Sequence, residues 1–101
     1  MNRISVEEFA VLLQRDEVPK ILDVREELEY YTFNIGAKNI PLGKLNHVLE
    51  DLDWDTEEEI IVLCQHGIRS KTACQILSNA GFNKVRNLEG GLVQWRKMMA
   101  K

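Results

Sequence analysis

The sequence predicts a three-layer α/β domain in which helices cover both faces of a parallel β-sheet. One observation is the run from Ile60 to Leu63, which is continuously apolar, as in a strand buried on both faces. Another is that segments with strand character alternate along the chain with segments of helical periodicity. Ligands of such domains bind beyond the carboxyl ends of the strands, so a site is expected just after Leu63.

The first half of the chain predicts helices and short strands in alternation. Ser5 followed by Glu8 forms a capping box for an amphipathic helix that ends near Asp16. A strand is expected at 21–24, a helical turn at 26–31, and a turn, brief strand and proline stop over 34–41. One further buried helix face is predicted by the spacing of Leu45, Val48, Leu49 and Leu52.

The second half continues this alternation around a loop at Cys64. The helix after the loop is expected to end at Gly81 and to bury Ala73, Ile76, Leu77 and Ala80. A last strand is expected at 84–88, and Gly90-Gly91 predicts a turn. The closing helix is expected to pack through Leu92, Trp95 and Met99.

Composition and charge are those of an ordinary water-soluble protein. The 101 residues are 45% hydrophobic and 29% charged, with a formal net charge of −3. One domain over 1–101 is expected, because about 100–150 residues is a common size for a single core. Nucleic acid is not an expected partner, because no basic stripe could follow a phosphate backbone. The acidic stretch from Glu50 to Glu59 is interpreted as a solvated turn, with a docking patch as the alternative.

The N-terminal residues show no apolar segment of the kind found in signal peptides. The longest purely apolar run, from Ile60 to Cys64, is far too short to span a bilayer. We therefore expect a cytoplasmic protein with no membrane partner. In a reducing compartment, a cysteine close to a histidine is better explained by its chemistry than by a disulfide.

Chemistry is expected from the loop segment Cys64-Gln65-His66-Gly67-Ile68-Arg69-Ser70. A reactive cysteine acts as a thiolate, and the N–H groups and dipole at the start of the next helix favour that anion. Arg69 can add a permanent charge, and Gly67 lets successive N–H groups curl toward one point. This cradle of N–H groups would also hold a persulfide anion on Cys64. The alternative is that Cys64 is simply a buried, unreactive cysteine.

Four motifs, in order along the chain, resemble those of rhodanese-like domains. They are Asp23-Val24-Arg25-Glu26 with Glu29-Tyr30, Gly36-Ala37-Lys38-Asn39-Ile40-Pro41-Leu42, Cys64-x-x-Gly67-x-Arg69-Ser70, and Leu88-Glu89-Gly90-Gly91 with Trp95. Together they cover nearly the whole chain. The family's Gly-His-Ile-Pro-Gly-Ala segment differs, because Phe33-Asn34-Ile35-Gly36-Ala37 lacks the Gly-His pair and the proline.

The resemblance implies a central parallel five-stranded sheet flanked by helices, and a ping-pong sulfurtransferase. Cys64 would take sulfane sulfur from a small donor, thiosulfate or a persulfide, and pass it to a nucleophilic acceptor such as a thiol or a protein. Substrate would be bound by Gln65, His66, Gly67, Ile68, Arg69 and Ser70. Asp23 and Arg25 are candidates for supporting the site. No metal or organic cofactor is implied.

Two other functions are weighed against sulfur transfer. Domains of this fold also serve as non-enzymatic interaction or regulatory modules, although the presence of Cys64 with Gly67 and Arg69 favours chemistry. Related phosphatases and arsenate reductases place five residues between the cysteine and the arginine. Here there are four, Gln65 to Ile68, and the shorter ring should fit one sulfur atom and crowd a phosphate.

The remaining polar candidates keep two interpretations. His66 either tunes or contacts the site, or points to solvent. Asp23 is more easily explained by an internal ion pair or loop anchor than by a direct role, and Arg25 is left open. Cys64 and His66 lack a second clustered pair of zinc ligands, because His47 and Cys74 are isolated in the sequence.

Cys74 and the tryptophans are expected to be structural. Along a helix Cys74 would lie about 15 Å from Cys64, whereas disulfide-bonded Cα atoms approach within about 7 Å. Cys74 is therefore interpreted as a packing residue in preference to a resolving thiol. Trp54 and Trp95 are interpreted as core or cover residues.

Overall fold

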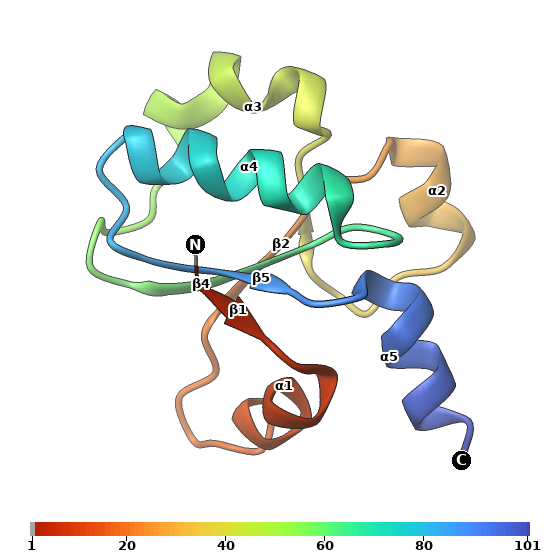
Figure 1. The fold of residues 1–101 in the computed structure, drawn as a ribbon. Helices are drawn as coiled ribbons and strands as arrows, with labels where there is room; N and C mark the ends of the chain where they lie inside the picture. The colour runs from red at the N-terminus through yellow and green to blue at the C-terminus, as the bar shows by residue number, and fades with distance from the viewer. Residues whose placement is uncertain (1) are drawn as a thin grey trace.

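The computed structural model describes residues 2–101, which form one five-stranded sheet with helices on both faces (Figure 1). The strands are β1 (Arg3–Ile4), β2 (Lys20–Asp23), β3 (Lys38–Asn39), β4 (Glu59–Leu63) and β5 (Lys84–Leu88). Their order in the sheet is β1-β5-β4-β2-β3, and every neighbouring pair is parallel. The expected α/β fold with a central parallel sheet is confirmed.

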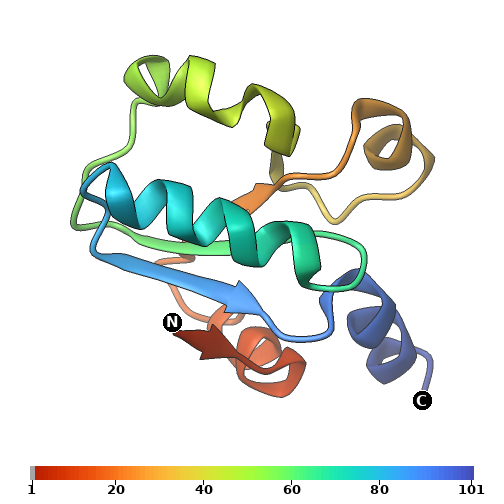
Figure 2. The ribbon, with the colours of Figure 1, turned by 45° about the horizontal axis from the view of Figure 1, so that its top comes forward.

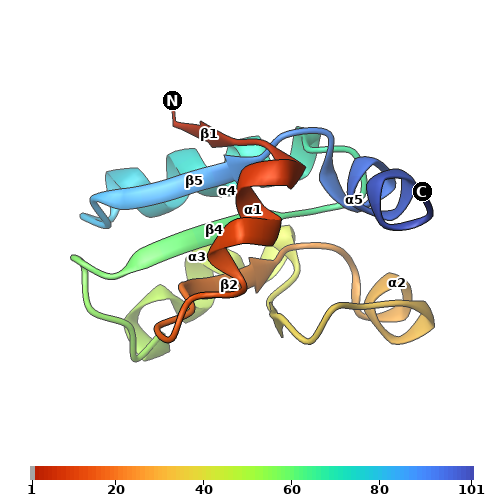
Figure 3. The same cartoon turned by 90° about the horizontal axis from the view of Figure 1, so that it is seen from below.

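Helices lie on the two faces and at one end of this sheet. They are α1 (Val6–Leu12), α2 (Glu27–Thr32), α3 (Leu42–Val48), the short 3₁₀ helix η1 (Leu49–Asp51), α4 (Ile68–Asn79) and α5 (Gly91–Met99). In Figure 1, α3 and α4 lie above the sheet and α1 lies below it. Seen from below, α2 lies beyond the sheet at the same end as α5 (Figure 3).

Alternation along β4 divides the core into two halves. Ile60 and Val62 pack with residues of α3 and α4, whereas Ile61 and Leu63 pack with residues of α1 and α5. Successive side chains of a strand point to opposite faces, so the next residue, Cys64, falls on the α4 face. Its side chain is 1% exposed and belongs to that half of the core.

Strand register brings the site residues to one edge of the sheet. In the parallel pair of β2 and β4, Asp23 lies opposite Leu63, and the Val24 N–H donates to the Leu63 carbonyl at 3.0 Å. In the pair of β4 and β5, Val62 lies opposite Asn87. The residues that follow β2, β4 and β5 therefore emerge together at the carboxyl edge, where the site was expected.

Several predicted boundaries and faces were wrong. The first helix ends at Leu12, not near Asp16, and the 45–52 helix is divided between α3 and η1. Ala80 is exposed because it lies at the C-cap of α4, beyond the last packed turn. Met99 is 62% exposed, and its neighbour Met98 packs instead.

Other structural expectations are confirmed. Ser5 and Glu8 form the capping box of α1. Gly81, with a φ of 100°, follows the C-cap of α4. Trp95 is buried and packs edge-on against Phe9, with ring centroids 5.1 Å apart, and Trp54 packs partly buried against the core. In the part of the chain that the structure describes, the helices are too short and too polar to cross a membrane.

Candidate active site

The loop between β4 and α4 curls around the sulfur of Cys64. The backbone N–H groups of Gly67 and Ser70 donate to Sγ at 3.1 and 3.3 Å, and the Ser70 hydroxyl lies 3.3 Å from the same atom. Gly67 is the N-cap of α4 and has a φ of 89°, which favours glycine. The predicted cradle of N–H groups around Cys64 is therefore present.

The start of α5 holds the outer side of this loop. The Leu92 and Val93 N–H groups donate to the carbonyls of Cys64 and Gln65 at 2.9 and 3.0 Å. The C=O and N–H groups of a trans peptide point in opposite directions. Turning these carbonyls toward α5 therefore turns the N–H groups of the same peptides away from α5, and one of them, that of His66, donates to the Cys64 sulfur. Figure 2 shows the loop beside the first turn of α5.

Gly91 makes this close approach possible. A Cβ atom at Gly91 would lie 2.5 Å from the Cys64 carbonyl oxygen and 2.6 Å from that of Gln65. Its φ is also 62°, in the left-handed region. The sequence predicts a turn at this glycine pair, but not its contact with the loop. Two successive glycines at the start of a helix were the available signal of a close backbone contact.

Arg69 forms an ion pair with Glu29 at the rim of the loop. Its Nη1 and Nη2 atoms donate to the two carboxylate oxygens of Glu29 at 2.6 and 2.9 Å. The hydrogen bond from Arg69 outweighs burial and lowers the pKa of Glu29 to about 2, and the same hydrogen bond raises the pKa of Arg69. Arg69 was expected to add a permanent charge beside Cys64, and in the structure this charge is paired with the carboxylate of Glu29.

Asp23 and Arg25 form a buried ion pair behind the loop. Arg25 Nη2 lies 2.8 Å from an Asp23 carboxylate oxygen, and Arg25 Nε donates to both Asp23 oxygens at 3.0 and 3.1 Å. Arg25 also donates to the carbonyls of Glu29 and Phe33 at 3.3 and 2.7 Å, and to Gln65 Oε1 at 3.5 Å. Both residues therefore anchor loops around the site, and only the contact with Gln65 reaches the active-site segment.

The surroundings of the two cysteines set their pKa values apart. Burial raises the pKa of Cys64, but hydrogen bonds from the Ser70 hydroxyl and from the N–H groups of Ser70, Gly67 and His66 outweigh burial. The pKa of Cys64 is consequently lower than that of an ordinary thiol. Burial, together with the charge of Cys64, raises the pKa of Cys74 to about 12. Both cysteines are free thiols, and Cys74 packs in the core as expected.

The outward residues of the loop lie beside a shallow groove. His66 is exposed, Ile68 is 75% exposed and Gln65 is half-buried. The groove has a volume of about 440 Å³ and is lined by Arg25, Leu28, Glu29, Thr32, Phe33, Gln65 and Arg96. The Arg96 guanidinium lies 4.1 Å from the centre of the Phe33 ring. A reactant could approach the loop along this partly apolar, partly basic surface.

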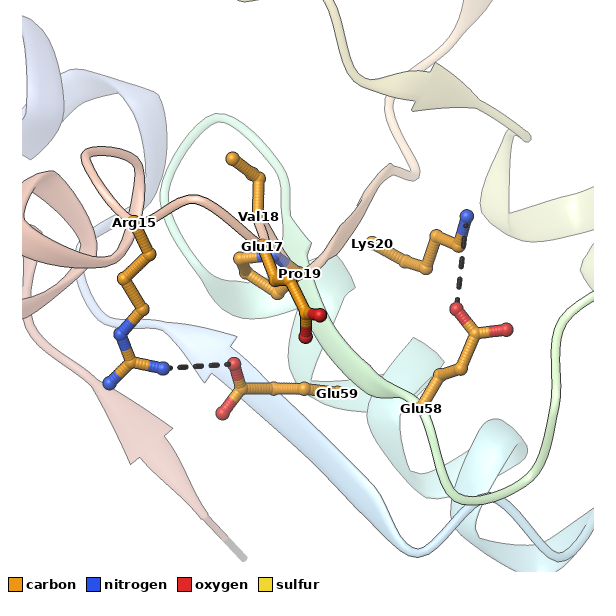
Figure 4. A pocket seen from close by; sticks show the side chains of 7 residues that line it. All are labelled: Arg15, Glu17, Val18, Pro19, Lys20, Glu58 and Glu59. Carbon is orange, nitrogen blue, oxygen red and sulfur yellow. Dashed lines mark ion pairs between the residues drawn. The ribbon is translucent and has the colours of Figure 1, made fainter.

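A second groove, of about 380 Å³, lies at the opposite, amino edge of the sheet (Figure 4). Its charged side chains face one another, with Arg15 3.9 Å from Glu59 and Lys20 3.7 Å from Glu58. It is remote from the carboxyl edge where Cys64 emerges. Over residues 2–101, histidine, cysteine and carboxylate side chains form no group of three that could hold a metal ion.

Comparison with known proteins identifies relatives of this chain. The Rhodanese-like domain family matches residues 5–98. The Bacillus subtilis protein YrkF is 38% identical over 93 residues, which cover 91% of this chain and 49% of YrkF. The Shewanella oneidensis thiosulfate sulfurtransferase GlpE is 32% identical over 100 residues, covering 98% of this chain and 96% of GlpE. A crystal structure of a Staphylococcus aureus rhodanese-like domain protein gives a TM-score of 0.86 at 28% identity, covering 94% of this chain and 91% of that one.

Proposed function

The chain belongs to the family of rhodanese-like domains, and from this premise we propose that it transfers sulfane sulfur through a persulfide on Cys64. The observation that carries the proposal is the convergence of N–H groups from Gly67 and Ser70 on the Cys64 sulfur. Donors arranged in this way stabilise a thiolate before the reaction and a persulfide anion after it. A metal or organic cofactor has no step in this chemistry.

The first half-reaction loads the protein with sulfur. The Cys64 thiolate attacks the outer sulfur of a donor such as thiosulfate and forms a new S–S bond. The S–S bond of thiosulfate breaks, and its electron pair leaves with sulfite. The outer sulfur of the persulfide then carries the negative charge. The N–H groups of the loop, residues 65–70, are the donors available to hold it.

The second half-reaction returns the enzyme to its starting state. A nucleophilic acceptor, a small thiol or a protein thiol, attacks the outer sulfur, and Cys64 leaves as a thiolate. The groove beside Gln65 offers a path for this acceptor, because it adjoins the loop and combines Leu28 and Phe33 with the guanidinium of Arg96. His66 and Ile68 are exposed on the same loop and would contact an acceptor too large to enter the groove.

Steady-state kinetics with thiosulfate as donor and cyanide as acceptor test the proposal. A persulfide intermediate predicts parallel lines in double-reciprocal plots, because the two substrates react in separate half-reactions. Cys64→Ser should abolish thiocyanate formation, and Cys74→Ser should retain it. Activity that survives Cys64→Ser would refute the proposal. A wild-type protein that turns over neither thiosulfate nor a small persulfide would favour the interaction module, and phosphate release from an aryl phosphate would favour phosphatase chemistry.

A further inference from the structure

Asn87 is a buried polar residue that contacts the active-site loop from behind. It lies on β5, is 6% exposed and faces the same side of the sheet as Cys64. Its Nδ2 donates to the Gly67 carbonyl at 3.0 Å, and its Oδ1 accepts a hydrogen bond from the Ser70 hydroxyl. Gly67 and Ser70 are also the residues whose N–H groups donate to the sulfur. One amide thus contacts two of the residues whose N–H groups donate to Cys64.

The chemistry of these groups fixes the direction of each hydrogen bond. The Gly67 carbonyl can only accept, so the NH₂ group of Asn87 must face it and Oδ1 must face Ser70. Oδ1 can only accept in turn, so the Ser70 hydroxyl proton points to Asn87. The lone pairs of that hydroxyl then face Cys64 and accept the S–H proton. This arrangement suits a sulfur that carries no negative charge.

A thiolate at Cys64 requires a different arrangement. The hydroxyl of Ser70 has only one proton, and a charged Sγ and Asn87 Oδ1 compete for it. We propose that Asn87 is a positioning residue that holds the Ser70 proton whenever Sγ is uncharged and yields it when the thiolate forms. In this exchange Asn87 acts through Ser70 and does not touch the reacting atoms.

This competition affects the catalytic cycle, a consequence that rests on the proposed sulfurtransferase function. In the free enzyme the reactive sulfur is Sγ itself, and the Ser70 proton moves toward it as the charge develops. In the persulfide, the charge lies on the outer sulfur and Sγ is neutral, so the proton returns to Asn87. Asn87 therefore favours the loaded enzyme over the free thiolate. No covalent bond breaks in this change: the Ser70 O–H rotates, so that its hydrogen bond to one acceptor is replaced by a hydrogen bond to the other.

Other charged groups around the sulfur do not take part in this exchange. Arg69 of α4 interacts with the charge of Cys64 and is paired with Glu29 of α2. Cys74, also on α4, remains protonated because its pKa is about 12. On β4 and β5, the residues on this face are Ile60, Val62, Val85 and Asn87 itself, none of which is charged. His66, on the loop itself, is exposed. All of these groups are the same in every variant, so differences in the titration of Cys64 report on Ser70 and Asn87 when only these two residues are varied.

A double-mutant cycle on the reactivity of Cys64 tests the proposal. The rate of Cys64 alkylation by iodoacetamide is measured across pH for the parent, Asn87→Val, Ser70→Ala and the double variant. Asn87→Val should free the Ser70 proton for the thiolate, raising alkylation below the pKa and shifting the pH profile downward. In the Ser70→Ala background, Asn87→Val can affect Cys64 only by removing the hydrogen bond to the Gly67 carbonyl. The factor by which Asn87→Val raises the alkylation rate of Cys64 should therefore be about three- to tenfold larger when Ser70 is present than in the Ser70→Ala background.

If Asn87→Val changes the alkylation rate by the same factor with Ser70 and in the Ser70→Ala background, the proposal is wrong and Asn87 is merely structural. If Asn87→Val fails to fold, Asn87→Ala replaces it with the same expectation. Asn39→Ala is the matched control, because the Asn39 amide also donates to two backbone carbonyls, those of Asp23 and Arg25, without touching Ser70. It should show no coupling to Ser70. Because alkylation needs no sulfur donor, this result stands even if the proposed sulfur transfer fails.

Discussion

Arg69 and Glu29 form a two-pronged ion pair at the rim of the active-site loop, with N–O distances of 2.6 and 2.9 Å. The pair joins the first turn of α4 to α2 across 40 residues of sequence. Both side chains are about one third exposed, at 36% and 37%, so the pair is partly screened by water. Its effect is to fix the guanidinium in place and to compensate most of its charge.

Glu29→Gln should accelerate the loading of Cys64 from thiosulfate. The substitution removes one negative charge beside the loop and leaves Arg69 free to face the dianion. At low ionic strength, we expect the second-order loading rate to rise about threefold and the gain to shrink as salt is added. Stopped-flow or quenched loading assays measure this rate. The loss of stability should be small, about 0.5 kcal/mol, as for other exposed ion pairs.

Glu27→Gln is the matched control for this experiment. Glu27 lies on the same helix and pairs with Lys44 at 3.1 Å, away from Arg69. Both substitutions remove one negative charge from the protein, but the charge of Glu27 does not lie beside Arg69. An equal acceleration in both variants would attribute the effect to net charge alone, and a slower Glu29→Gln variant would contradict the role assigned to the pair.

In the native protein, Cys64 should be the thiol that reacts with iodoacetamide at neutral and mildly alkaline pH. Its pKa is lowered by hydrogen bonds, so its thiolate appears at a lower pH than that of an ordinary cysteine, whereas Cys74 has a pKa of about 12. Peptide mass spectrometry after limited alkylation should find the label on Cys64. Ser70→Ala should move the pH profile upward. Preferential labelling of Cys74 in the folded protein would show that the loop does not stabilise the thiolate.

Gly91→Ala should damage the loop and slow persulfide formation. The added Cβ would overlap the carbonyl oxygens of Cys64 and Gln65, and alanine is strained at a φ of 62°. We expect a loss of about 2–3 kcal/mol in the free energy of unfolding and at least about a tenfold slower loading rate. Chemical denaturation and the loading assay measure the two effects.

Gly43→Ala provides the comparison for Gly91→Ala. A Cβ at Gly43 would meet nothing within 4 Å, and its φ is not in the left-handed region. Because Gly43 lies inside α3, alanine should stabilise the protein by about 0.5–1 kcal/mol. A Gly91→Ala variant as active and as stable as Gly43→Ala would rule out the close contact between α5 and the loop.

Arg25→Met should destabilise the protein strongly. It would leave the carboxylate of Asp23, which is fully buried, without its partner. Breaking a buried ion pair from one side costs about 3–5 kcal/mol. The double variant Asp23→Leu/Arg25→Met removes both charges and should recover part of this loss. Urea denaturation gives the free energies of unfolding of the parent and of the two variants, and an Arg25→Met variant that loses less than about 1 kcal/mol would contradict the anchoring role.

The sequence was sufficient to predict the parts of the site that depend on neighbouring residues. The apolar run of β4 places Cys64 at a strand end, and Gly67 permits the turn that points N–H groups at the sulfur. These features lie within a few residues of each other, so local pattern and backbone stereochemistry were enough. The order of the motifs along the chain supplied the remaining expectation, a five-stranded sheet.

Long-range features were not predictable from local pattern. The two residues of β1 form a strand only because they pair with Asn87 and Leu88 of β5. The partner of Arg69 lies 40 residues away, so the sequence predicted the charge of Arg69 but not the ion pair that it forms. Asn87 likewise appeared as one polar residue within a short strand, and its contacts with Ser70 and Gly67 exist only in the folded chain.

Intact-protein mass spectrometry after incubation with thiosulfate tests the central claim most directly. The wild-type protein and Cys64→Ser are compared before and after the addition of cyanide. The account predicts a gain of one sulfur atom in the wild-type protein alone, which cyanide removes as thiocyanate. A stable gain of sulfur in Cys64→Ser, or a gain in the wild-type protein that maps to Cys74, would contradict it.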